Sequence, residues 1–517
     1  MIIRALRSNI RHALHPAAEG GSRRMPQGRK NAKAMSEISR LEPRAVWEIF
    51  DEINRVPRPS KKEEQIIAYL EAFARRHGIE YKKDSAGNIV MYKKATPSMT
   101  GKPAVVLQSH MDMVCEKNSD VVFDFMKDPI QTYIDGEWVK ARGTTLGADD
   151  GIGMATALAL ITAEGVEHPD LEALFTVDEE TGLTGAFNLG SDMLTGHYLI
   201  NLDSEDDGEI FIGCAGGIDT VATFRYREEP APEGMVWMRA DIAGLKGGHS
   251  GDNINDGLGN SNKLLTRLLL AGTERAGLRL ASFDGGNLRN AIPREAHAVF
   301  GVPAAATDEL RRLAGELAEA IAAEYKYTDG GVRLTLRDAE RPATVIDADT
   351  QRALLLALQG VANGVLAMSR SMPGLVETST NLASVKFADD RRIVVTSSQR
   401  SSVESAKADA AATVGATFRL AGAEVEHGEG YPGWNPDPSS RLLQVAEAAY
   451  ERLFGTQPKV RAIHAGLECG LFLEKYPKLE MISVGPTLRG VHSPDERLEI
   501  ATVDKFWKFL IEILRTL

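Results

Sequence analysis

The stretch 171–182 decides the fold class, and it reads Leu-Glu-Ala-Leu-Phe-Thr-Val-Asp-Glu-Glu-Thr-Gly. Its first part is a short apolar run, which predicts a buried strand. Three consecutive acids, Asp178, Glu179 and Glu180, follow this strand directly. Because neighbouring acids repel one another and are costly to bury, they indicate a bound cation, with a solvated acidic turn as the alternative.

Apolar strands and helices alternate on both sides of this stretch. Ala104–Gln108 and Tyr198–Leu202 predict two more strands, and the small apolar residues of Gly151–Ala163 predict a helix. We therefore expect an α/β fold with a mostly parallel sheet flanked by helices. Ligand sites in such folds lie at the carboxyl ends of the strands, where this chain places its polar residues.

Two of these polar segments offer oxygen and imidazole ligands. His110 and Asp112 follow the strand 104–108, and in an extended segment both side chains point to one face. A surface histidine is the alternative, although a carboxylate is a usual partner of a metal-bound histidine. Asp149 and Asp150 stand between glycines just before a helix, where a single Asp would suffice as an N-cap.

Asp203 and His464 complete the set of candidate ligands, because Asp203 ends the strand 198–202 and His464 precedes a glycine turn. A set of imidazoles and carboxylates suits zinc. With one shared carboxylate it would hold two ions roughly 3.5–4 Å apart. Those ions would lower the pKa of a bridging water and polarise the scissile carbonyl, and one unligated carboxylate would act as general base.

The composition is that of a globular protein with two domains. The chain has 517 residues, of which 43% are hydrophobic and 26% charged, and its formal net charge is -12. The acidic balance argues against a nucleic-acid partner, and no apolar run approaches the roughly 18 residues that span a bilayer. Three cysteines without a CxxC pair favour a reducing compartment, so we expect a cytoplasmic protein.

Two parts of the chain differ from the rest. Residues 1–34 are rich in arginine and poor in acids, which predicts a disordered extension or an upstream start codon, with a transit peptide as the alternative. Over residues 217–430, amphipathic strands accompany long helices, which predicts an α+β domain. Because the α/β pattern returns at Tyr431, we expect a catalytic domain made of 35–216 and 431–517, with the α+β domain inserted into it.

The motifs resemble those of dinuclear zinc peptidases of the carnosinase and aminoacylase superfamily. The matching segments are His110-Met-Asp112, Asp149-Asp-Gly, Asp178-Glu-Glu-Thr-Gly, Asn201-Leu-Asp203 and His464-Ala-Gly-Leu-Glu. The longer runs Lys140–Asp149 and His464–Gly470 resemble the bacterial aminoacyl-histidine dipeptidase branch, also called cytosol non-specific dipeptidase. The resemblance extends from about Glu37 to the C-terminus.

The resemblance implies a dinuclear centre with two zinc ions, which Mn2+ or Co2+ could replace. Glu179 would be the general base, and Asp112 would orient a ligating histidine. The peptide bond Asp149–Asp150 would be cis. The implied ligands are His110 and Asp203 for one ion, Glu180 and His464 for the other, and Asp149 as the bridge.

The inserted domain resembles the lid of these enzymes. His249, in a Gly-Gly-His-Ser-Gly turn, would stabilise the tetrahedral oxyanion, and Asn290 would lie near the substrate. Arg400 would hold the substrate carboxylate through its planar fork. The alternatives are that the segment around His249 is a plain glycine turn and that Arg400 is a solvated surface arginine. His492 receives only a supporting role, and the resemblance implies a homodimer that associates through the lid.

The sequence therefore predicts metal-dependent hydrolysis of dipeptides, including Xaa-His dipeptides such as carnosine. The protein would bind small peptides, and we expect it to bind neither nucleic acid nor a membrane. A tripeptidase or an aminoacylase of the same superfamily is the first alternative, and a non-catalytic peptide-binding relative is the second. The retained Glu179 argues against the second, because a non-catalytic relative would often lose its base.

Overall fold

An eight-stranded sheet carries the strand ends that the sequence singles out. The computed structural model describes residues 36–517, so the prediction of a disordered extension at 1–34 lies outside the described residues. The strand order across this sheet is β1 (Glu80–Lys83), β2 (Ile89–Lys93), β6 (Leu171–Thr176), β3 (Val105–His110), β7 (Tyr198–Asn201), β23 (Glu480–Ser483), β8 (Glu209–Cys214) and β22 (Lys459–Ile463).

The centre of this sheet is parallel. Strand β3 lies between β6 and β7 and runs parallel to both, and β7 also runs parallel to β23. His110 is in register with Thr176, and Gln108 with Asn201. The residues that follow these strands therefore emerge at one edge, which brings His110 and Asp203 close together.

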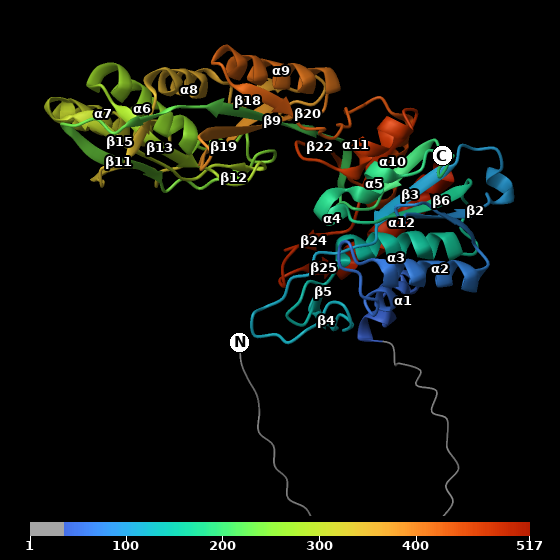
Figure 1. The fold of residues 1–517 in the computed structure, drawn as a ribbon. Helices are drawn as coiled ribbons and strands as arrows, with labels where there is room; N and C mark the ends of the chain where they lie inside the picture. The colour runs from blue at the N-terminus through green and yellow to red at the C-terminus, as the bar shows by residue number, and fades with distance from the viewer. Residues whose placement is uncertain (1–35) are drawn as a thin grey trace, which may run out of the picture. The chain divides into compact units, whose positions relative to one another are not determined.

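Helices cover this sheet, and a small four-stranded sheet adjoins it. Helix α3 packs along β3 and β6, and α1 packs on α3, while α10 packs against β23 and α12 (Figure 1). The helices are α1 (Arg44–Ile53), α2 (Glu64–His77), α3 (Ala148–Thr162), α4 (Glu179–Gly182), α5 (Thr184–Asn188), α10 (Arg441–Phe454), α11 (Glu468–Lys475) and α12 (Ile500–Thr516). The small sheet contains β24 (Leu488–Arg489), β25 (Arg497–Glu499), β5 (Trp138–Ala141) and β4 (Thr132–Asp135).

A second, nine-stranded sheet is antiparallel and has its own hydrophobic core, which includes Phe283, Phe300 and Phe418. Four helices lie on one face of it (Figure 1), namely α6 (Ser261–Ala276), α7 (Thr307–Glu324), α8 (Ala348–Gly360) and α9 (Glu404–Leu420). Its strands are β16 (Arg333–Asp338), β11 (Met235–Ala243), β15 (Ala296–Pro303), β13 (Arg279–Gly285), β19 (Val376–Ala388), β20 (Arg392–Ser401), β9 (Gly216–Arg225) and β21 (Glu424–His427), with β18 (Gly364–Met368) beside β19. Two short pairs complete the strands, β10 (Glu228–Pro230) with β17 (Thr344–Ile346) and β12 (Gly248–His249) with β14 (Ala291–Ile292).

The chain passes from the first sheet to the second and back along one short antiparallel pairing. Cys214 exchanges backbone hydrogen bonds with Trp434, and Gly217 does so with Tyr431. The predicted fold class, a mostly parallel sheet with helices plus an α+β part, is confirmed. The domain boundaries at 216/217 and 430/431 stay a prediction. No helix between residues 36 and 517 combines the length and the apolar character needed to cross a bilayer.

Candidate metal centre and substrate cavity

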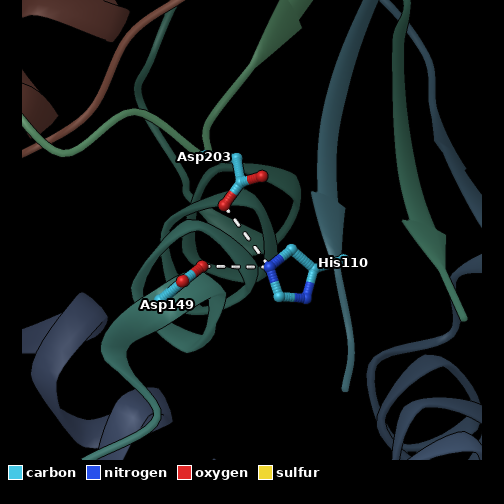
Figure 2. A group of neighbouring side chains, drawn as sticks. All are labelled: His110, Asp149 and Asp203. Carbon is cyan, nitrogen blue, oxygen red and sulfur yellow. Dashed lines mark hydrogen bonds and ion pairs between the residues drawn. The ribbon is translucent and has the colours of Figure 1, made fainter. Parts of the chain in front are cut away.

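The first candidate ligand group joins His110 to two aspartates. The Nε2 atom of His110 lies 3.0 Å from Oδ1 of Asp149 and 3.4 Å from Oδ1 of Asp203. Figure 2 shows both carboxylates directed at this one nitrogen. The other ring nitrogen, Nδ1, lies 3.4 Å from Oδ1 of Asp112. The geometry therefore agrees with Asp112 as the residue that orients His110.

The second group shares Asp149 and adds Glu180 and His492. The Nε2 atom of His492 lies 3.1 Å from Oδ2 of Asp149 and 2.9 Å from Oε2 of Glu180. Asp149 thus gives one carboxylate oxygen to each group, as the bridging role requires. Burial alone would raise the pKa of Asp149, but hydrogen bonds from His110 and His492 hold that pKa well below its usual range.

The donor set fits two divalent cations. Burial raises the pKa of Asp203 well above its ordinary value, and the nearby carboxylates of Asp149 and Glu179 add to the rise. The buried Oε1 atom of Glu180 has no hydrogen-bond partner among the described residues. Cations between these groups would stabilise the ionised carboxylates, and imidazole with carboxylate is a donor set that zinc accepts.

His464, which the sequence placed beside Glu180, belongs to neither group. Its Nε2 atom forms a 2.7 Å hydrogen bond with Oγ of Ser379 on β19. Burial and the neighbouring Arg400 lower the pKa of His464 to about 4, so the imidazole is neutral. The physical reason is topological: β22 is an edge strand, separated from β3 and β6 by other strands of the sheet.

His492 occupies the place that the sequence gave to His464. It lies in the turn between β24 and β25, and β25 pairs with β5, the strand that leads to Asp149. His492 has a positive φ of 60° and does not follow a long strand. The rule that ligands lie at the ends of predicted strands therefore does not identify it. The Gly-Val-His-Ser-Pro-Asp-Glu run at 490–496 was the signal that could have found it.

Glu179 and Glu180 begin helix α4, directly after β6. The backbone N–H of Glu179 donates to Oδ1 of Asp112 at 3.0 Å, and that of Glu180 donates to Oδ2 at 3.3 Å. Asp112 therefore fixes this turn as well as facing His110. Burial raises the pKa of Glu179 to about 8, and the carboxylates of Glu468 and Glu180 contribute to the rise.

Two buried charged residues that the sequence did not reveal hold the ligand segments. Glu496 accepts hydrogen bonds from the amides of Leu146, Gly147, Ala148 and Asp149, at 2.7, 3.0, 2.7 and 3.3 Å. Arg58 donates to the carbonyl of Asp112 at 2.8 Å and to that of Gly147. The peptide bond Asp149–Asp150 is cis, as the resemblance implied.

A cavity of about 730 Å³ adjoins the second ligand group. Glu179, Glu180 and His492 line one side of it, and residues of the nine-stranded sheet and its loops line the other. The Nη1 atom of Arg400 donates to the hydroxyl of Tyr431 at 3.0 Å. The predicted substrate residues meet here, because the lining includes His249, Asn290 and Arg400.

The imidazole of His249 has partners on both of its ring nitrogens. Its Nε2 atom lies 3.4 Å from Nη2 of Arg400, and Nδ1 lies 3.1 Å from Oδ2 of Asp252. All of these residues come from one chain. The arrangement joins a cluster of metal ligands, an adjacent carboxylate and a cavity lined by Arg400, which suits peptide hydrolysis by a metal centre.

The fold and the site define a metallopeptidase. The chain belongs to the peptidase family M20/M25/M40, whose model matches residues 106–516. It is 44% identical over 481 residues to the cytosol non-specific dipeptidase of Escherichia coli (strain K12), covering 93% of this chain and 99% of that protein. The resemblance inferred from the motifs is thereby confirmed.

Solved structures agree with this family. The aminoacylhistidine dipeptidase from Vibrio alginolyticus matches with a TM-score of 0.89 and 42% identity, covering 93% of this chain and 98% of that chain. The aminopeptidase PepT from Bacillus cereus matches with a TM-score of 0.55 and 16% identity, covering 92% of this chain and 98% of that chain. The second match, at this low identity, shows a shared fold alone.

Proposed function

We propose that this chain hydrolyses dipeptides with a free C-terminal carboxylate, Xaa-His dipeptides such as carnosine among them, and that two metal ions take part. The observation that carries the proposal is the cavity in which Glu179 and Glu180 face the arginine Arg400. Its volume of about 730 Å³ suits a small peptide. Two of the relatives are named as dipeptidases, which supports the same substrate class.

The proposed metal ligands differ from the sequence-based set at one position. One ion would be held by His110, Asp203 and Asp149, and the other by Asp149, Glu180 and His492. Zinc is the proposed metal, since imidazole and carboxylate ligands suit it, and Mn2+ or Co2+ would also be accepted. Bound cations supply Lewis acidity, which makes a water more acidic and polarises a carbonyl.

Glu179 is the proposed general base. Its carboxylate adjoins the ligand Glu180 but lies in neither ligand group, and it lines the cavity. A carboxylate in this position takes the proton of the attacking water onto Oε and then delivers it to the departing amine. Its raised pKa matches this task, because a base that must also release the proton works best near the operating pH.

Arg400 is the proposed anchor for the C-terminal carboxylate, and His249 is the proposed stabiliser of the oxyanion. A guanidinium fork binds carboxylate in a bidentate manner, and the Nε atom of Arg400 has no hydrogen-bond partner among the described residues. Asn290 lines the same wall and would contact the bound peptide. An anchor at a fixed distance from the metal ligands measures substrate length, which favours dipeptides over longer chains.

Location and assembly are further proposals. A cytoplasmic location is supported by a relative named as a cytosol enzyme and by the few cysteines. We also propose a homodimer that associates through residues 217–430, which form the nine-stranded sheet and its helices. This proposal rests on the family resemblance. Light scattering measures the mass directly, and a monomer with full specific activity at nanomolar concentration would refute any need for a partner.

The function is tested by measuring hydrolysis of carnosine, Gly-Leu, Gly-Gly-Gly and an N-acetyl amino acid by the zinc-loaded enzyme. We expect turnover of both dipeptides, loss of turnover with a chelator, and recovery when Zn2+, Mn2+ or Co2+ is added. Faster cleavage of the tripeptide would indicate a tripeptidase, and faster cleavage of the acetylated substrate would indicate an aminoacylase. Binding of dipeptides without turnover would support the non-catalytic alternative.

A further inference from the structure

A pair of neighbouring strands places an acidic residue beside the proposed carboxylate anchor. In the antiparallel pair β9–β20, Gly217 lies opposite Arg400 and Asp219 lies opposite Ser398. Residues directly opposite each other, and residues two apart, share one face of a sheet. Because Arg400 and Asp219 both line the cavity, this shared face is the one that looks into it.

Strand pairing sets where the two residues lie along the sheet, and Tyr431 holds the side chain of Arg400. The ring of Tyr431 covers Gly217, where an added Cβ would lie 2.8 Å from ring atoms. The hydroxyl of Tyr431 accepts a hydrogen bond from Arg400, which fixes the guanidinium above this glycine. Asp219 stands two residues further along, a step of roughly 6.8 Å at strand geometry.

Asp219 is paired with an arginine from a loop that also lines the cavity. Its Oδ2 atom accepts a 2.9 Å hydrogen bond from Nη1 of Arg289, the residue before Asn290. The side chain of Asp219 is 24% exposed, whereas that of Arg289 is 68% exposed. An ion pair with so exposed a partner is held weakly, so a ligand group can replace the arginine at Asp219 at little cost.

We propose that Asp219 and Arg289 form the subsite for the side chain of the substrate's C-terminal residue, and that Asp219 favours side chains that donate a hydrogen bond, histidine above all. The inference rests on the proposed dipeptidase function, in which Arg400 holds the carboxylate. The carboxylate and the side chain of that residue leave the same Cα atom. Asp219 lies two residues along the strand from the residue opposite Arg400 and lines the same cavity, so it is the acidic group beside which that side chain would lie.

The chemistry of the pair gives the subsite its preference. An ionised carboxylate only accepts hydrogen bonds, so it favours the N–H of an imidazole or an ammonium group over an aliphatic side chain. Arg289 only donates, so it would serve an acidic side chain instead. Removing one member of the pair should therefore shift preference toward the side chains that the remaining member binds.

The test compares kcat/KM for Gly-His, Gly-Leu and Gly-Glu with the metal-loaded, full-length enzyme. For Asp219→Asn we expect the Gly-His to Gly-Leu ratio to fall about tenfold and the Gly-Glu to Gly-Leu ratio to rise severalfold, as loss of a charge-assisted hydrogen bond implies. Arg289→Gln should lower the Gly-Glu to Gly-Leu ratio. Asp284→Asn is the matched control, because it breaks a 2.8 Å ion pair with Lys386 on the same sheet but outside this cavity.

Equal changes for all three substrates in Asp219→Asn would overturn the subsite and make the pair a structural tie between β9 and the loop. A wild-type enzyme that cleaves none of the three would refute the proposed function instead. Calorimetric titration with the products L-histidine and L-leucine still decides the subsite in that case, because product binding needs no turnover. Asp219→Asn should then lose most of the preference for L-histidine, and an unchanged preference would overturn the proposal.

Discussion

The two walls of the cavity differ in how their functional side chains are held. On the wall that carries Glu179 and Glu180, Asp112 binds the amides of both residues, and Glu496 binds four successive amides that end at the neighbouring ligand Asp149. On the wall of the nine-stranded sheet, Arg400 has a hydrogen bond to Tyr431 and a longer contact with His249. The functional residues of the first wall are therefore held by hydrogen bonds to their backbone amides. Those of the second wall are held by fewer side-chain contacts.

This difference assigns separate tasks to the two walls. Metal ligands must keep their geometry through the reaction, and residues that orient them are worth about 10–100-fold in metal affinity or activity. Substrate-binding donors instead gain their partners when the peptide arrives, and Arg400 lines the cavity into which the peptide would come. Substitutions on the first wall should therefore change metal content or kcat, and those on the second should change KM.

The largest effect is expected at Glu179. Glu179→Gln keeps the shape of the side chain and removes its capacity to accept a proton, so kcat should fall about 10²–10⁴-fold. Both metal ions should remain, because Glu179 lies in neither ligand group. Glu180→Gln is the matched variant and should weaken metal binding. Elemental analysis beside turnover on carnosine checks both, and a Glu179→Gln enzyme with near wild-type kcat would eliminate the general-base assignment.

The next prediction separates the two candidate histidines. His492→Ala removes a group 2.9 Å from Glu180, so the variant should lose one of two metal ions per chain, with affinity lowered by at least about 100-fold. His464→Ala should retain both ions, because its imidazole bonds to Ser379. Metal titration of the two purified variants decides the question. Loss of an ion from His464→Ala alone would restore the assignment made from the sequence.

Most of the fold and of the first ligand group could be predicted from the sequence, whereas His492 received only a supporting role and the buried supports Arg58 and Glu496 received none. His110, Asp149 and Asp203 follow predicted strands or precede a predicted helix, so the rule for parallel sheets brings them to one edge. His492 lies in a turn of a small separate sheet, whose pairing with β5 no local pattern encodes. Arg58 gave no signal, because a buried arginine in a loop looks like any solvated one in sequence.

On the second wall, Arg400→Ala should lower kcat/KM for free dipeptides about ten- to a few-hundred-fold. A charge-assisted fork to a carboxylate is worth roughly 1.5–3 kcal/mol, and its loss should act mainly through KM. Dipeptide amides, which lack the carboxylate, should lose much less. Arg400→Lys serves as a control that keeps the charge without the fork. Equal losses on acids and amides would make Arg400 a structural residue.

Glu496→Gln tests whether the first wall depends on its backbone contacts. The variant keeps one acceptor oxygen and loses the charge, so the loop that carries Asp149 should be held less firmly, and metal affinity should fall about 10–100-fold. Asp495→Asn, at the adjacent exposed position, is the control and should bind metal as the wild type does. Unchanged affinity in Glu496→Gln would mean that the metal ions themselves hold the loop.

The smallest effect is expected at Tyr431, whose ring stays in place between Gly217 and Gly466 when only its hydroxyl is removed. Tyr431→Phe loses the 3.0 Å hydrogen bond from Arg400, but the guanidinium itself stays beside the cavity, so the effect on carboxylate binding is indirect. We expect KM for free dipeptides to rise about 2–10-fold, with kcat and metal content unchanged.

A double-mutant cycle then shows whether Tyr431 acts through Arg400. If the hydroxyl only positions the guanidinium, adding Tyr431→Phe to Arg400→Ala should change kcat/KM no further, because the group that it positions is already gone. The dipeptide amides should be insensitive to Tyr431→Phe for the same reason. Fully additive losses would instead mean that the tyrosine contacts the substrate directly, and this wall would then have a second anchor of its own.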